Sequence, residues 1–459
     1  ELDVSHFDTK NVVNMNSMFE SAKANQLDLK NFNTSKVTDM GNMFNNTVVN
    51  QLDLDHFDTS NVTNMAKMFA DAKVTQLNLK SFNTQKVTDM SGMFANDSLT
   101  DLDLSNFDTH NVTKMNGMFE KLKKVTSLDL SHFDTQNVTT MAYMFADASD
   151  LVKVNTTGWD TRNLTDTQYM FKNMNSLTDF DLGNLNTGKV EDMTGMFSGF
   201  NHLDQLDLSK LDTRNVIYMV GMFEKVANVK KIDVSQFDVR KVTRTFNMFR
   251  NCTALSEINL KGWNPKSLTD IGNMFRNDKN LVNVDLGKLN TKNLYSTIDL
   301  FRNDTKLETV DLRGWKTSKV VETARMFMDC PNLTYVNLRG WKMSKLDDST
   351  QMFYHDKKLT GVDLSHFNIH NSQILLQAGN PEGFAVKLGH YKLRKSSGVG
   401  KGFKHIQAVG KGTIRNPKGK KYTAKQLQKL YSHSAKKSPK ETYVMYNGKK
   451  PQLPKSFHF

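Results

Sequence analysis

Two patterns of apolar residues alternate along most of this chain and recur about every 26 residues. The first is a three-residue alternation of apolar and polar positions, as at residues 128–130, which is typical of a short strand. The second places apolar residues on one face of a helix, as at Val138, Met141, Met144 and Phe145. Each repeat is therefore predicted to contain one strand and one short helix.

The period is nearly constant along the chain. The L-D-L triplet begins at Leu2, recurs at steps of 25 residues as far as Leu102, and then recurs at steps of 26 as far as Val362. One strand and one short helix cannot bury their apolar faces alone, so the repeats must stack on one another. We predict an α/β fold: a leucine-rich-repeat-like solenoid of about 15 strand–helix repeats with a parallel sheet.

Several conspicuous residue types are explained by this stack. The tryptophans take the Phe position of the repeat, and the methionines lie at helical spacing, so both are expected in the core. Cys252 and Cys330 lie three repeats apart, on the order of 14 Å at strand spacing. That separation exceeds the reach of a disulfide, and we expect two buried thiols.

Composition changes sharply near residue 380. Residues 380–459 hold 19 Lys and Arg residues but only two acids, Glu382 and Glu441, whereas the preceding residues hold 42 basic and 46 acidic ones. We therefore divide the chain into a solenoid, residues 1–379, and a small basic α+β domain, residues 380–459. A capping-box pattern at Thr423 predicts a short helix over 423–431. This domain is also expected to cover the open end of the solenoid.

The excess of positive charge points to a polyanionic partner. Tyr391, Phe403 and Tyr422 are interleaved with the basic residues. The alternative is a solvated surface that only keeps the protein soluble. The candidate ligand-binding residues are Lys392, Arg394, Lys395, Lys401, Lys404, Lys411, Arg415, Lys418, Lys420 and Lys421.

A second candidate feature is the polar residue at the centre of each predicted strand, which is Asp or Asn throughout. If these side chains form a free row along one face, neighbouring carboxylates raise one another's pKa and the row responds to acid. The alternatives are local hydrogen bonds with Ser, Thr or Lys of the next strand, or a row of calcium ions. The proposed pH-sensing ladder is Asp28, Asp53, Asp103, Asp129, Asp181, Asp207, Asp233, Asp285 and Asp311. Binding to polyanions is then expected to be stronger at about pH 4 than at pH 7.

The unit L-D-L-S-x-F-D-T-x-N-V-T-x-M-x-x-M-F closely resembles the repeat of BspA-type leucine-rich-repeat bacterial surface proteins. Residues 102–119 match it almost position by position, and the resemblance covers about residues 1–375. It implies a secreted protein of the bacterial cell surface or cell wall that attaches bacteria to host tissue. The chain opens inside a repeat, so we expect a fragment whose signal and anchor lie elsewhere.

We expect a cell-surface adhesin, not an enzyme, with no cofactor and no metal ion. Its expected ligands are anionic glycans of host mucin or epithelium, or glycosaminoglycans, with nucleic acid and anionic wall polymers as other polyanions. The alternative is a solenoid whose concave face binds a host protein, with the basic domain serving as a cap or wall anchor. Membrane insertion is not expected, because no apolar stretch reaches the length of a span.

Overall fold

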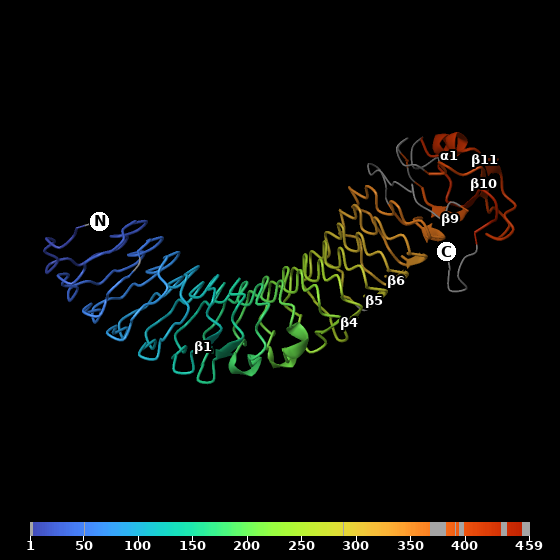
Figure 1. Cartoon of the computed structure of the whole chain (residues 1–459). Coiled ribbons are helices and arrows are strands. Elements are labelled where there is room, and N and C mark those ends of the chain that lie inside the picture. The colour runs from blue at the N-terminus through green and yellow to red at the C-terminus, as the bar shows by residue number, and fades with distance from the viewer. Residues whose placement is uncertain are drawn as a thin grey trace. The chain divides into compact units, whose positions relative to one another are not determined.

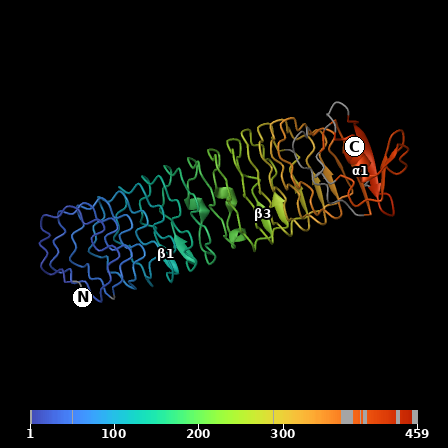
Figure 2. The same cartoon turned by 90° about the horizontal axis from the view of Figure 1, so that it is seen from above.

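The computed structural model describes residues 3–49, 51–287, 289–367, 382–390, 392–393, 399–432 and 438–451. The chain forms two compact units, residues 1–216 and 217–459. Within each unit, successive repeats run as stacked coils (Figure 2). The predicted parallel solenoid is confirmed, whereas the count of fifteen repeats and the boundary at residue 380 remain predictions.

Short parallel strands mark the predicted L-D-L positions in part of each unit. In the first unit, β1 (Ser127–Asp129) pairs with β2 (Lys153–Asn155). The repeats that follow β2 have short 3-10 turns instead of strands: η1 (Leu182–Asn184), η2 (Leu203–Gln205) and η3 (Leu208–Lys210).

In the second unit, β3 (Lys231–Asp233) pairs with β4 (Glu257–Asn259). A further parallel sheet joins β5 (Asn283–Asp285), β6 (Thr309–Asp311) and β7 (Tyr335–Asn337) in that order. The register is one full repeat, as in the pairing of Val284 with Val310 and of Val310 with Val336. The apolar strand residues therefore stack directly over one another.

The predicted helix in each repeat is wrong. Over residues 15–21 the backbone makes two tight turns, and Ser17 and Ser21 have φ values of 57° and 61°. Methionines three residues apart fit such a turn as well as they fit a helix, so the apolar spacing alone did not separate the two. The left-handed conformation recurs at equivalent positions, which are rich in Gly and Asn because these residues adopt it at low cost.

Most of these turn amides bond to the neighbouring repeat. The N–H of Ser17 donates to the carbonyl of Gly41 at 2.9 Å, and that of Phe19 donates to Met43 at 2.9 Å. A helix would use these amides within its own turn. Each repeat therefore depends on the next for its backbone hydrogen bonds.

In each unit a column of phenylalanines lies between the turns. In the first unit the rings of Phe19, Phe44, Phe69 and Phe94 stack in sequence, with centroids 5.7–5.8 Å apart. In the second unit the rings from Phe223 to Phe353 stack in the same way.

The core role expected for the tryptophans is confirmed, because all four are at most 8% exposed. Cys252 and Cys330 are buried free thiols, as expected.

The last described solenoid strand, β8 (Gly361–Asp363), pairs with β9 (Gly383–Leu388), and the two lie side by side in Figure 1. From β9 an antiparallel sheet continues through β12 (Glu441–Tyr446) and β10 (His405–Ala408) to β11 (Lys421–Tyr422). Val362 and Leu364 at this end are fully buried. The predicted helix is confirmed as α1 (Ala424–Leu430), with the capping box at Thr423 in place.

Four aspartates that the repeat pattern did not predict to be buried lie under the turns. They are Asp97, Asp278, Asp304 and Asp356, each at most 2% exposed. In each of them Oδ2 has no hydrogen-bond partner among the described residues. Burial raises the pKa of all four carboxyls, that of Asp97 to about 8. Burial therefore favours the neutral form of these carboxyl groups.

The first testable prediction concerns the left-handed turns. Asn96 has a φ of 53°, so Asn96→Val should destabilise the first unit by roughly 1–2 kcal/mol, because a β-branched residue disfavours this conformation. Asn96→Gly, which also loses the amide but tolerates the backbone, should cost less. Urea denaturation followed by circular dichroism measures both, and an equal loss in the two variants would contradict this account.

A second prediction concerns the buried acid Asp97. Its folded pKa, about 8, lies above the ordinary value of 3.8, so the folded state holds a proton that the unfolded state releases. Its stabilising contribution is complete below pH 3.8 and is lost at roughly 1.4 kcal/mol per pH unit as pH rises towards 8. Asp97→Asn, which keeps an acceptor for the N–H of Ser98, should therefore raise the melting temperature more at pH 8 than at pH 4. A pH-independent change would show that Asp97 is not protonated.

Candidate functional site

Four of the predicted ligand-binding residues lie on one loop. Residues 409–420 connect β10 to β11 and carry Lys411, Arg415, Lys418 and Lys420, all exposed. Two hydrogen bonds hold the loop backbone in place, because the Gln407 side-chain amide donates to the carbonyls of Pro417 and Gly419 at 3.1 Å each. The loop thus presents charged side chains on a defined backbone.

The remaining predicted residues are more dispersed. Lys421 begins β11, and Lys401 and Lys404 lie just before β10, where the N–H of Lys404 donates to Asn447 at 2.7 Å. Lys392 is exposed on a separate segment. Arg394 and Lys395 lie outside the described residues.

The charge of these basic side chains is not balanced by neighbouring acids of the described chain. None of the eight that are described forms an ion pair with any acidic group of the described chain. Some basic side chains of the repeats do have such partners, as Lys10 and Lys30 are paired with the aspartate two residues earlier. The Lys420 ammonium lies 5.6 Å from the centre of the Tyr422 ring, a cation–π geometry. The loop charge is therefore available to an external anion.

The aspartates of the proposed pH-sensing ladder are not free. Each accepts a hydrogen bond from the backbone N–H two residues ahead, as Asp28 does from Lys30 at 3.3 Å. The same bond occurs at every other member: Asp53, Asp103, Asp129, Asp181, Asp207, Asp233, Asp285 and Asp311. The aspartates are therefore held by local hydrogen bonds, but the shared donor is a backbone N–H of the same repeat and not a side chain of the next strand. Asn serves equally well as this acceptor, which explains why Asp and Asn interchange.

The expected rise in pKa is wrong for five ladder residues. Hydrogen bonds from the residue two positions ahead lower the pKa of Asp28, Asp103, Asp129, Asp207 and Asp233 below the ordinary value of 3.8. The hydrogen-bonded carboxylate is stabilised, and this outweighs repulsion between neighbours. The charged form of these carboxyl groups is therefore favoured.

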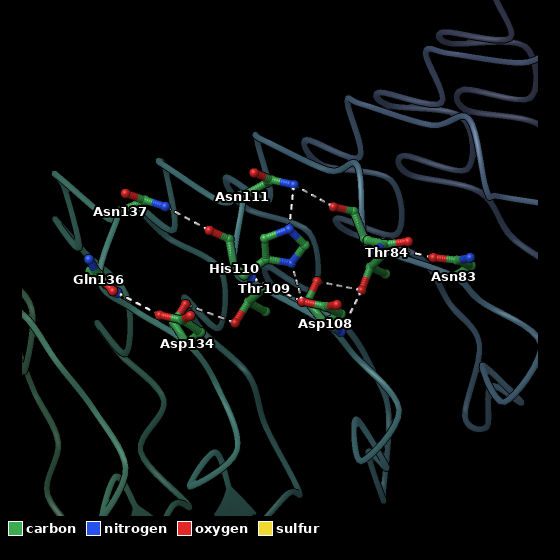
Figure 3. A network of polar contacts seen from close by, with 10 residues as sticks. Asn83, Thr84, Asp108, Thr109, His110, Asn111, Asp134, Gln136 and Asn137 are labelled. Carbon is green, nitrogen blue, oxygen red and sulfur yellow. Dashed lines mark hydrogen bonds and ion pairs between the residues drawn. The ribbon is translucent and has the colours of Figure 1, made fainter.

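The D-T turn contains a second polar ladder, shown in Figure 3. The Thr84 hydroxyl donates to the Asp108 carbonyl and accepts the Asp108 N–H, each at 2.8 Å. His110 Nδ1 lies 2.6 Å from the Asp108 carboxylate, and its Nε2 lies 2.7 Å from the Asn111 amide. Asn137 donates to the His110 carbonyl from the next repeat. Both imidazole nitrogens thus have partners, and the histidine acts as part of the inter-repeat network.

A cluster of arginines that was not predicted from the sequence lies in the second unit. Arg276, Arg302 and Arg325 all approach the carboxylate of Asp299, which is only 5% exposed. Arg325 binds it through two nitrogens, at 2.8 and 2.9 Å. The sequence feature that could have identified this cluster is the tripeptide F-R-N, which occurs at the same position of three consecutive repeats.

The described residues contain no cluster of three or more His, Cys, Asp or Glu side chains arranged to hold a metal ion. Nor does any helix in the described ranges have the length and apolar character needed to cross a membrane.

Comparison with solved structures finds other repeat proteins. A leucine-rich repeat protein from Bacteroides ovatus is 15% identical, with a TM-score of 0.35, and the match covers 58% of this chain and 78% of that one. A leucine-rich repeat protein from Eubacterium ventriosum is 18% identical, with a TM-score of 0.35, and the match covers 72% of this chain and 74% of that one. No curated protein sequence matches the chain.

The family model described as "Mycoplasma protein of unknown function, DUF285" matches four overlapping segments of the chain: residues 1–98, 72–180, 173–280 and 247–367. Together these segments take in all of the repeats up to β8. The chain therefore belongs to the DUF285 family.

Proposed function

We propose that this protein is a non-enzymatic adhesin of the BspA-like type, displayed on the bacterial cell surface, that binds anionic host glycans through its basic C-terminal region. The observation that carries the proposal is the loop over residues 409–420, whose four basic side chains are exposed on a braced backbone and lack ion pairs with described acids. Mucin glycans and glycosaminoglycans have the charge that this loop complements. Nucleic acid and bacterial wall polymers are polyanions that the same charge would attract.

A second candidate is a solenoid that binds a host protein, in which the basic region is a cap or wall anchor. The pairing of β8 with β9 favours it, because Val362 and Val386 are adjacent and both are fully buried. A strand in that position covers an edge that would otherwise be open to other chains. Salt distinguishes the two candidates, since binding to a polyanion weakens steeply with salt and binding through an apolar protein interface does not.

The direct test substitutes three loop residues together, Lys411→Gln, Arg415→Gln and Lys418→Gln, in the full chain. Affinity for heparin should fall by about tenfold or more at low salt, and the slope of log K against log salt should fall by roughly 2–3. Surface plasmon resonance over a salt series measures both.

The control removes three equal charges from ion-paired lysines of the repeats: Lys10→Gln, Lys30→Gln and Lys153→Gln. This variant should bind as the wild type does. Equal losses in the two variants would show that net charge, not the loop, determines binding.

Acid pH should strengthen binding, but at a lower pH than free carboxylates would give. Asp28, Asp103, Asp129, Asp207 and Asp233 have lowered pKa values, so they lose their negative charge only as pH falls below 3.8. Affinity for heparin should therefore rise mainly below that value, with the fold followed by circular dichroism. A rise completed between pH 6 and pH 5 would assign the effect to other groups.

A further inference from the structure

Three consecutive repeats of the second unit carry the same two residues after the stacked phenylalanine. The pairs are Arg250 and Asn251, Arg276 and Asn277, and Arg302 and Asn303, which together we call the Arg–Asn row. All six side chains are half-buried. The asparagines have φ values of 64–68°, so the left-handed backbone accounts for them. No comparable backbone requirement accounts for the arginines.

The arginines are crowded and incompletely paired. Arg250 contacts Glu224 at 3.3 Å, while Arg276, Arg302 and Arg325 share the single carboxylate of Asp299. These four guanidinium groups therefore exceed the two carboxylates that they contact. The Nε atoms of Arg250 and Arg276 are buried and have no hydrogen-bond partner among the described residues.

Without a bound anion, this arrangement of arginines lowers the stability of the folded protein. Burial lowers the pKa of Arg276; the Asp299 carboxylate acts against this shift, and the positive charges of Arg302, Arg250 and Arg325 add to it. A buried N–H without a partner costs about 1–3 kcal/mol. A tetrahedral oxyanion would offset both costs, because guanidinium groups bind such anions through paired N–H donors.

The asparagines add hydrogen-bonding capacity beside the charge. The Asn277 amide donates to Asn251 at 2.6 Å, and the Asn303 amide donates to Asn277 at 2.8 Å. Each of these bonds uses one N–H of the donor amide and one lone pair of the acceptor oxygen, so Asn277 keeps a second N–H and a second lone pair. Sugar hydroxyls, which both donate and accept, match these remaining groups.

From this geometry we propose that the Arg–Asn row is a binding site for sulfated glycan, separate from the basic C-terminal loop. Successive arginines lie one repeat apart, so three of them span about 10 Å. Positive charges at this spacing match a ligand with several anionic groups per disaccharide, which sulfate esters supply. The site rests on the proposed function for its ligand class, and places glycan recognition on the repeats as well.

The test uses the full chain and a heparin octasaccharide as the probe. The variant Arg250→Gln, Arg276→Gln and Arg302→Gln should lower affinity about tenfold and reduce the salt slope by roughly 2–3. The matched control removes three other arginines, Arg162→Gln, Arg240→Gln and Arg313→Gln, each paired with the aspartate two residues earlier. The control should bind as the wild type does, and equal losses in the two variants would overturn the proposal.

A second variant tests the site in the opposite direction. Asp299→Asn removes the carboxylate that competes for three guanidinium groups while keeping the size of the side chain. Affinity for the octasaccharide should rise severalfold, which a purely structural role of the arginines would not produce. Should the triple variant be unfolded, Arg276→Gln and Arg302→Gln are measured singly, each expected to lose about threefold; unchanged affinity in both would overturn the proposal.

The loop variant Lys411→Gln, Arg415→Gln and Lys418→Gln separates this inference from the proposed function. Loss of binding only in the loop variant overturns the Arg–Asn row and leaves the proposed function intact. Loss only in the row variant supports the row and removes the loop as the binding site. Single-stranded DNA or unsulfated polyuronate that competes as well as the octasaccharide, charge for charge, would overturn the assignment to sulfated glycan.

Discussion

The fold depends on backbone hydrogen bonds that no repeat can complete by itself. The amides of Ser17 and Phe19 find their acceptors one repeat ahead, at Gly41 and Met43. Because those partners must arrive in register, the period can vary only slightly, and side chains at equivalent positions lie in columns. The stacked phenylalanines and the hydroxyl ladder through Thr84 are consequences of that register. A solenoid of this kind gains its cooperativity from nearest neighbours.

At equivalent positions of the repeats, some residues are required by the backbone conformation and others are only compatible with it. Asn277, with its positive φ, is required by the backbone, as is the acceptor at Asp28. Tyr143 and Tyr169 occupy left-handed positions where Gly or Asn is less strained, and their rings stack 5.0 Å apart. Arg276 satisfies no requirement of the backbone. In a repeat protein, a residue that differs from those at equivalent positions of the other repeats is therefore more informative about function than one that matches them.

Periodicity made the solenoid and its core predictable from the sequence, because burial repeats with the chain. Trp315 and Met40 could be placed in the core by position alone, and the capping box at Thr423 located α1. The turns over residues 15–21 could not be separated from a helix, since the spacing of the methionines fits both. The backbone conformation distinguishes a turn from a helix, and in the sequence only the recurrence of Gly and Asn at the left-handed positions indicated it.

The polar residues were harder to interpret, because their chemistry depends on hydrogen bonds that sequence does not show. Asp103 and Asp97 are both aspartates of the repeats, yet their pKa values move in opposite directions. Asp103 is exposed and accepts from the Ser105 N–H, which favours its charged form. Asp97 is buried with an unpaired oxygen, which favours its neutral form. Spacing alone therefore cannot rank acidic residues as pH sensors.

The same reasoning separates the two proposed anion sites. The lysines of the C-terminal loop are exposed and hydrated, so they attract a polyanion over distance and lose that attraction in salt. The guanidinium groups around Asp299 are half-buried, so their desolvation cost has already been met in the folded protein, and short-range geometry decides which anion they accept. The exposed loop would therefore favour rapid association with a polyanion, and the Arg–Asn row would favour selectivity among anions. Together the two proposed sites would let a repeat protein select one anionic glycan from many.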